Sequence, residues 1–143
     1  MMVQEKQNVS APAASTVRFL REIPGFAGIH FYNIYEPAEG TPFYRLIPDR
    51  EEFSFLLLHT FDYFKEYDFE LPKHEQDLLQ LIDESKILVF SIVNWGNGLK
   101  EATVNLKAPI VVNPENGTAL QIIIDTEDYQ VKEPLLPAIM KSR

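Results

Sequence analysis

The sequence predicts a mostly β fold with seven or eight strands and one short helix, arranged as an antiparallel β-barrel-like closed sheet or as a two-sheet sandwich. Two observations lead to this prediction. Short runs rich in β-branched and aromatic residues recur along the chain and are bounded by Pro, Gly and Asn. Only one stretch has a helical pattern, and the absence of strand–helix alternation argues against a parallel sheet.

The composition is that of one globular domain. The chain has 143 residues, 45% apolar and 24% charged, and no cysteine, so disulfides and thiolate metal sites are excluded. We expect a disordered N-terminal arm over 1–15, one β domain over 16–134 and a C-terminal tail over 135–143. No apolar run approaches the ~20 residues of a membrane helix, and 1–15 lack a signal-peptide core. We therefore expect a cytoplasmic protein without membrane contact that is a monomer when free.

Four strands are expected in the first part of the domain, at 16–23, 29–35, 43–47 and 53–58. The first strand ends at the Pro24-Gly25 turn, and a charged turn at 48–52 follows the third. The fourth strand, FSFLLL, is apolar at successive positions, which predicts burial on both faces.

Residues 59–71 (HTFDYFKEYDFEL) carry five aromatic side chains within nine residues, interleaved with charges. Two interpretations remain open for this stretch. It is either a loop or short strand that pins several rings to the core, or a partly exposed aromatic groove that binds a peptide. In the second interpretation Tyr63 and Phe64 are the candidate contacts.

A short amphipathic helix is expected from Pro72 to about Ser85. Proline suits the first turn of a helix, acidic residues follow it, and four aliphatic side chains gather on one side: Leu78, Leu79, Leu81 and Ile82. A continuous apolar strand at 87–93 comes next and ends at a turn that contains Gly-Asn-Gly.

The sequence of residues 103–125 predicts a β-hairpin. Its first strand has apolar side chains at every second position, which would place five of them on one face: Val104, Leu106, Ala108, Ile110 and Val112. Residues 114–117 form the turn, and Leu120, Ile122 and Ile124 resume the alternation. Pro109 has no N–H to donate, so we expect an open edge or a bulge there.

The C-terminal part has open interpretations. Residues 126–129 can add one more short strand. The tail that follows contains two prolines, which exclude a long helix, and four apolar side chains: Leu135, Leu136, Ile139 and Met140. This tail either packs on the domain or serves as a docking segment.

The net charge of −8, from 21 acidic and 13 basic side chains, limits the possible partners. Nucleic-acid binding needs basic side chains that replace phosphate counterions, so we expect no direct nucleic-acid partner. A basic protein partner fits the charge, and an acidic face kept for solubility is the alternative. Two clusters are candidate contacts, of which the second is favoured because it contains no lysine: Glu66, Asp68 and Glu70, and Asp125, Glu127 and Asp128.

We expect no catalytic, metal or cofactor site. The histidines at 30, 59 and 74 have no metal-site spacing, and the glycines at 96 and 98 lack the lysine and the following helix of a phosphate loop. The protein is therefore not expected to be an enzyme.

Four motifs occur in a fixed order over roughly residues 16–135. They are Ile23-Pro24-Gly25-Phe26, Pro42-Phe43, Tyr67-x-Phe69-Glu70-Leu71, and Asn105-Leu106-x-Ala108-Pro109-Ile110-Val111-Val112-Asn113 followed by Gly117 and Gln121-Ile122-Ile123. The set resembles the FliW family of bacterial flagellar assembly factors. This resemblance implies a compact β-barrel-like fold with little helix.

The resemblance also implies a regulator that acts by binding. FliW binds newly made flagellin and, when flagellin has been exported, binds the translational repressor CsrA and prevents it from silencing flagellin mRNA. Flagellin and a CsrA-like repressor are thus the expected partners. The alternative is a small β-barrel that carries an apolar ligand or an extended peptide and has no role in RNA control.

Overall fold

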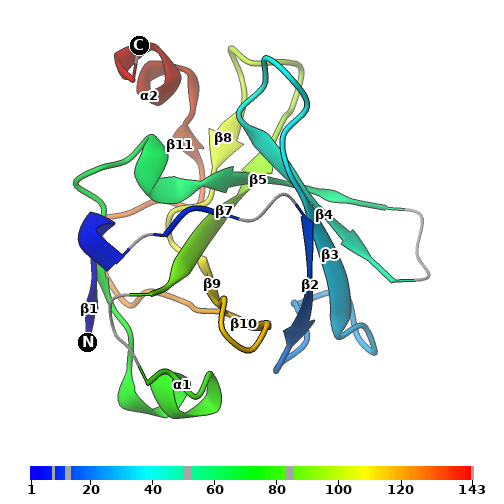
Figure 1. Ribbon diagram of the computed structural model, residues 1–143. Coiled ribbons are helices and arrows are strands. Elements are labelled where there is room, and N and C mark those ends of the chain that lie inside the picture. Colours follow the sequence, from blue (N-terminus) through cyan, green and yellow to red (C-terminus); the bar gives the residue numbers. More distant parts are fainter. Residues whose placement is uncertain (8, 12–13, 50–52, 83–85, 143) are drawn as a thin grey trace.

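The computed structural model describes residues 1–7, 9–11, 14–49, 53–82 and 86–142. Figure 1 shows strands wrapped around a centre, with short helices outside them. The described helices are α1 (Lys73–Leu78) and α2 (Leu136–Lys141), with 3-10 turns at Glu5–Gln7 and Thr60–Asp62. The strands are β1 (Met2–Val3), β2 (Ala14–Phe19), β3 (Phe31–Tyr35), β4 (Phe43–Pro48), β5 (Phe55–His59), β6 (Phe69–Glu70), β7 (Leu88–Asn94), β8 (Thr103–Val104), β9 (Ile110–Asn113), β10 (Thr118–Gln121) and β11 (Glu133–Pro134).

Seven of these strands close into a barrel in the order β7-β5-β4-β3-β2-β10-β9, because β9 pairs with β7 as well as with β10. The closing register places Val112 opposite Leu88 and Ile110 opposite Phe90. The described strands pair in antiparallel fashion except β2 and β10, which are parallel. The predicted mostly β, largely antiparallel barrel is confirmed, and closure removes the sheet edges that a sandwich would leave.

Alternate residues of the barrel strands face two different cores. One core fills the barrel with large side chains, among them Phe19, Tyr32, Leu46, Leu57 and Phe90. The other, which we call the outer core, lies between the barrel and the segments that cover one of its walls, and its strand residues include Leu58, Val89, Val111 and Leu120. Leu57 and Leu58 are both fully buried, which confirms the prediction for the fourth strand.

The hairpin is confirmed, but its first strand is not continuous. Asn113 pairs with Thr118 at the turn between β9 and β10. The side-chain oxygen of Asn105 accepts hydrogen bonds from the N–H groups of Lys107 and Ala108, which folds the chain into a turn between β8 and β9. As a result the five alternating residues do not share one face: Val104 and Leu106 lie in the outer core, whereas Ile110 and Val112 lie inside the barrel.

Of the two features expected at Pro109, an open edge or a bulge, the open edge is wrong. β9 begins after Pro109 and has hydrogen-bonded partners on both sides. The carbonyl of Pro109 accepts the N–H of Ile122 at 2.9 Å, so this part of the hairpin continues beyond the regular ladder. A missing donor is tolerated here because the proline precedes the strand.

The helix after residue 72 is shorter than predicted. α1 ends at Leu78, and Gln80 then adopts a φ of +53°, which a right-handed helix cannot contain. Leu79 is fully buried, but Ile82 is 90% exposed, so the expected apolar side of this helix was wrong. The expected end near Ser85 lies outside the described residues, as do residues 50–52 of the expected charged turn.

Both ends of the described chain pack on the barrel. The expected disordered arm differs from the structure, because β1 pairs with β6 and Val3 is fully buried in the outer core. At the other end Leu135 is fully buried, and β11 pairs with β8. The short strand considered at 126–129 is absent, and its place along the chain is taken by bends before β11.

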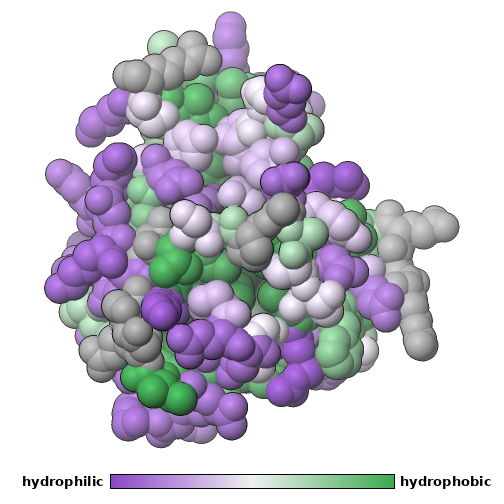
Figure 2. Space-filling model, in the orientation of Figure 1, coloured by the Kyte–Doolittle hydropathy of each residue, from purple (hydrophilic) through white to green (hydrophobic). Residues whose placement is uncertain are grey.

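The surface is largely hydrophilic on the face seen in Figure 2, where hydrophobic side chains gather near α1 and near α2. Each described α-helix has six residues, and the described residues contain no candidate transmembrane helix. The wall formed by β2, β3 and β4 is exposed on its outside, where Phe31 and Tyr35 are 52% and 43% exposed.

Candidate functional site

The aromatic stretch divides between the outer core and the surface. Phe61, Tyr67 and Phe69 are buried in the outer core, and the hydroxyl of Tyr67 donates to the carbonyl of Leu106 at 2.6 Å. Tyr63 and Phe64 are only half-buried and pack against the same core from outside. The interpretation in which rings pin the segment to the core therefore holds for Phe61, Tyr67 and Phe69. Peptide binding by the half-buried Tyr63 and Phe64 stays a prediction.

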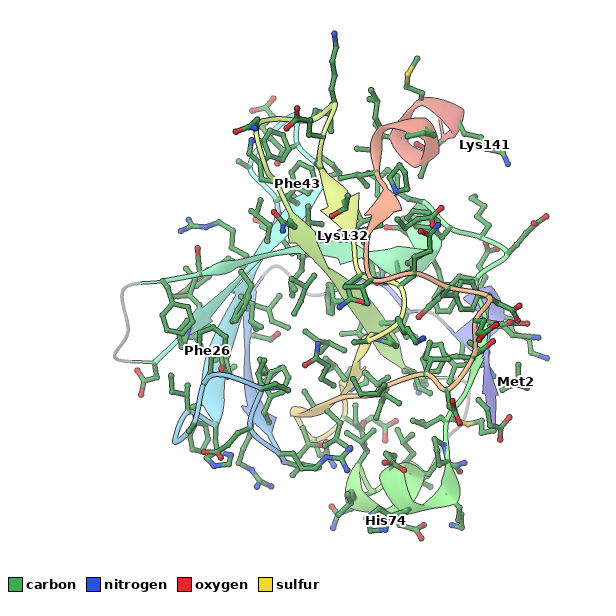
Figure 3. All side chains as sticks on the ribbon, turned by 180° about the vertical axis from the view of Figure 1, so that it is seen from behind. Met2, Phe26, Phe43, His74, Lys132 and Lys141 are labelled. Atoms are coloured by element: carbon green, nitrogen blue, oxygen red, sulfur yellow. The ribbon has the colours of Figure 1, made fainter. Side chains whose placement is uncertain are left out.

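A groove of about 740 Å³ lies between this aromatic segment and the C-terminal part of the chain. Figure 3 shows α2, which carries Lys141, at the same end of the molecule as the segment that leaves β5. Lining residues come from both segments: Asp62, Tyr63, Phe64, Lys65, Glu66, Tyr67, Leu106, Asp128, Tyr129, Glu133, Pro134, Pro137, Ala138, Lys141 and Ser142. The groove combines apolar and aromatic side chains with four acids and two lysines.

The two acidic clusters meet at this groove. The hydroxyl of Tyr129 donates to the carboxylate of Asp68 at 3.3 Å and accepts the backbone N–H of Asp68 at 3.1 Å. Glu66 and Asp128 both line the groove. We call the combined surface the acidic rim: Glu66, Asp68, Asp125, Glu127 and Asp128. The sequence treated the clusters as competing sites, whereas in the structure each cluster contributes one residue, Glu66 or Asp128, to the same groove.

Glu70 differs from the other five candidate acids. It lies in β6, and its carboxylate is 2.6 Å from the amine of Met1. The acidic rim residues make no ion pair with any described residue. Their charges are therefore available to a partner, while that of Glu70 is engaged within the chain.

Sequence reasoning missed residues whose role depends on distant contacts. Tyr129 was noted only as part of a possible strand, and its partner is 61 positions away. Ile123 is 69% exposed between the buried Ile122 and Ile124, and it precedes the acid at 125. The alternation of the second hairpin strand already points Ile123 outward, and this signal could have identified it as an exposed apolar residue beside acids.

A smaller depression of about 240 Å³ lies beside His59, Asp62 and Tyr44. His59 is 4% exposed, its ring packs against Phe90, and its Nδ1–H donates to the carboxylate of Asp62 at 2.9 Å. This contact holds the turn that leads from β5 into the aromatic segment. The described residues contain no group of three or more His, Cys, Asp or Glu side chains placed to hold a metal ion.

Comparisons with known proteins agree on one family. The family described as "FliW protein" matches residues 3–135. The chain is similar to a protein named flagellar assembly factor FliW from Caldanaerobacter subterraneus, with 34% identity over 122 residues that cover 84% of this chain and 81% of the relative. It is 39% identical over 108 residues to the protein of that name from Campylobacter lari, covering 75% and 81% of the two chains.

A solved structure shows the same similarity in three dimensions. The crystal structure of a flagellar assembly factor FliW superposes with a TM-score of 0.77 at 27% sequence identity. The superposition covers 96% of this chain and 98% of the other. The barrel and the segments that cover it are thus similar in the two proteins.

Proposed function

This chain belongs to the FliW family of flagellar assembly factors, and on that premise we propose that it binds flagellin and a CsrA-like translational repressor at adjoining surfaces. Binding of the repressor would prevent it from silencing flagellin mRNA, and binding of flagellin would release the repressor. This function couples flagellin translation to flagellin export by protein–protein contact alone and requires no catalytic step.

The groove is the proposed site for flagellin. Tyr63 and Phe64 supply half-buried rings on one side, and Pro137 and Ala138 supply apolar surface on the other. Its volume of about 740 Å³ is enough for a few side chains of an amphipathic helix, a common mode of peptide binding. Burial raises the pKa of Tyr63, with a smaller contribution from Asp62. Like any tyrosine at physiological pH, Tyr63 carries a neutral hydroxyl that can donate a hydrogen bond to a bound helix.

The acidic rim is the proposed site for the repressor. Five carboxylates without ion-pair partners among the described residues form a negative surface that attracts a basic protein and speeds association. Ile123 lies two residues before Asp125 and offers an exposed apolar contact beside these charges. Apolar anchors surrounded by polar residues often carry much of the binding energy at interfaces.

The observation that carries the proposal is the hydrogen-bonded pair of Tyr129 and Asp68. It joins the acidic rim to the groove, so a helix seated in the groove lies beside the rim. Two partners of protein size cannot occupy adjoining sites of this extent without contact between them. We therefore propose that flagellin and the repressor exclude each other sterically.

A competition experiment tests this proposal. The purified protein is immobilised, the repressor is bound, and flagellin is then added while repressor release is recorded. We expect each partner to bind alone, and flagellin to displace the repressor with increasing concentration. Simultaneous binding without mutual effect would contradict adjoining sites, and failure of both partners to bind would contradict the assignment of partners.

The alternative, a carrier of an apolar ligand, has less support. Phe19, Tyr32, Leu46, Leu57 and Phe90 fill the barrel, so the place for an apolar guest is the surface groove. Native mass spectrometry of the purified protein separates the two functions, because a carrier would retain a small molecule.

A further inference from the structure

The outside of the β2–β3–β4 wall carries arginine and aromatic side chains in register. Arg18 is opposite Phe31 in the pairing of β2 with β3, and Arg45 is opposite Tyr35 in the pairing of β3 with β4. Between these rows Asn33 is opposite Ile47. We call this surface the arginine–aromatic face: Arg18, Phe31, Asn33, Tyr35, Arg45 and Ile47.

Arg18 and Arg45 have no ion-pair partner among the described residues, although the chain is rich in acids. The chain contains 21 acidic and 13 basic side chains, an excess of eight acids. Of the three arginines in the described ranges, Arg21 pairs with Glu75 at 3.4 Å, whereas Arg18 and Arg45 make no ion pair with a described residue. Asp49 stands at the margin of the face, where its N–H donates to the carbonyl of Phe31. Both arginines are exposed, and the residue opposite each of them on β3 is aromatic.

The spacing of the face matches an extended peptide. Phe31 and Tyr35 are four residues apart on one strand, which corresponds to about 13 Å. In an extended segment, side chains at alternate positions point the same way, so an acid, an aliphatic residue and a second acid span that length. Arg18 on β2 and Arg45 on β4 flank β3 on opposite sides, so each would reach across to one carboxylate of a segment that lies along β3, in the bidentate geometry that guanidinium favours. Stacking of each guanidinium on the ring opposite it, Phe31 or Tyr35, would hold that guanidinium in place.

We propose that the arginine–aromatic face binds an extended acidic segment of a partner protein, with the pattern Glu-x-Ile-x-Glu. The glutamates would bind Arg18 and Arg45, and the isoleucine would lie between Phe31 and Tyr35. β3 is three strands from β7 in one direction around the barrel and four in the other, so this face lies opposite the wall covered by the outer core. The site is therefore independent of the groove and the acidic rim. A nucleic acid is disfavoured as the partner by the net charge of −8.

Chemical-shift titration of the ¹⁵N-labelled full chain tests the proposal. The probe is an acetylated ten-residue peptide with Glu-Thr-Ile-Thr-Glu at its centre, at low salt. We expect saturable shifts at Arg18, Phe31, Asn33 and Tyr35. The double variant Arg18→Glu, Arg45→Glu should bind at least about tenfold more weakly, because two attractive contacts become repulsive. Circular dichroism confirms that this variant remains folded.

A matched control separates a specific site from general charge. The double variant Lys100→Glu, Lys132→Glu changes the net charge by the same amount at exposed positions outside the face, and it should bind the peptide within about threefold of the parent. A second peptide with lysine in place of both glutamates should not bind. The proposal would be overturned if both double variants lost the same factor in peptide affinity. It would also be overturned if the chemical-shift changes were confined to residues of the groove, or if they did not saturate at millimolar peptide. Tighter binding of a ten-nucleotide oligouridylate would overturn it in favour of RNA.

Discussion

Tyr129 and Asp68 are hydrogen bonded in both directions, since the hydroxyl of Tyr129 donates to the Asp68 carboxylate and accepts the Asp68 backbone N–H. The two residues are 61 positions apart and belong to the two segments that carry the acidic clusters. This pair links the aromatic segment to the segment that carries Asp128, beside the groove that residues of both segments line.

Removing that hydroxyl should loosen the connection. Tyr129→Phe keeps the ring against Tyr67, 4.7 Å away between centroids, but leaves the Asp68 N–H without its acceptor. We expect the free energy of unfolding to fall by about 1 kcal/mol, the usual net value of such a hydrogen bond. Urea denaturation measures the change. Tyr35→Phe, at an exposed ring, is the matched control, and an equal effect in both variants would show that the pair does not stabilise the fold.

Substitution by aspartate should destabilise the fold strongly at one isoleucine of the hairpin and hardly at all at its neighbour. Ile122 is 4% exposed in the outer core and Ile123 is 69% exposed. Ile122→Asp buries an unpaired charge and should cost several kcal/mol, enough to unfold a domain with ~5–15 kcal/mol of stability. Ile123→Asp should melt within a few degrees of the parent. Thermal melts followed by circular dichroism decide, and a cooperative melt of Ile122→Asp near the parental temperature would contradict the register.

Alkaline pH should destabilise the fold through Tyr67. Burial is the main reason that the pKa of Tyr67 lies far above its ordinary value, with a smaller effect of Tyr129. The unfolded tyrosine ionises near pH 10 while the folded one stays protonated, so this contribution is full below about pH 10 and is lost as pH rises further. Urea midpoints between pH 8 and 11 should fall above pH 10, and less steeply in Tyr67→Phe. In Tyr35→Phe the urea midpoint should fall with pH as steeply as in the parent. An equally steep fall in Tyr67→Phe would show that Tyr67 is not the origin of the alkaline destabilisation.

We expect the two half-buried rings that line the groove, Tyr63 and Phe64, to contact flagellin. Tyr63→Ala or Phe64→Ala should weaken flagellin binding by about 2 kcal/mol, as truncation of a buried interface anchor typically does. Ile82→Ala removes an apolar side chain that is 90% exposed and does not line the groove, so it should have no effect. Isothermal titration with purified flagellin provides the affinities. Parental affinity in both ring variants would move the flagellin site elsewhere.

Features set by local sequence could be predicted. The alternation of Leu120, Ile122 and Ile124 places all three in the outer core, and the continuous apolar run predicted as a strand at 87–93 forms the buried strand β7. Alternating apolar residues mark a strand with one buried face, because side chains repeat every two residues. A continuous apolar run marks a strand that is buried on both faces. The four motifs, taken together and in order, were sufficient to indicate the family.

Features set by distant or specific contacts could not be predicted. The turn capped by Asn105 interrupts an alternation that otherwise fits one strand, and pairing of β9 with β7 closes the edge expected at Pro109. Likewise nothing near Asp68 in the sequence indicates its bond to Tyr129. The composition of the groove depends on how the C-terminal segment crosses the barrel, which local patterns do not specify.

The association rate with a CsrA-like repressor, measured by stopped flow at several salt concentrations, tests the role of the acidic rim most directly. Reversal of Asp125, Glu127 and Asp128 to lysine should slow association more than tenfold at low salt and flatten its salt dependence, since charges are screened beyond about 8 Å at physiological ionic strength. Glu66→Lys should also slow it, because both clusters form one rim. The melting temperature should stay nearly unchanged.

The matched control for this measurement reverses three exposed acids elsewhere, Glu36, Glu39 and Glu101, and thus makes the same change in net charge. It should slow association only a few-fold, because these acids lie outside the rim. The association rate could fall by the same factor in the rim and control variants, or neither variant could change the rate or its dependence on salt. Either result would show that the acidic rim is a solubility feature and not the site that attracts the repressor.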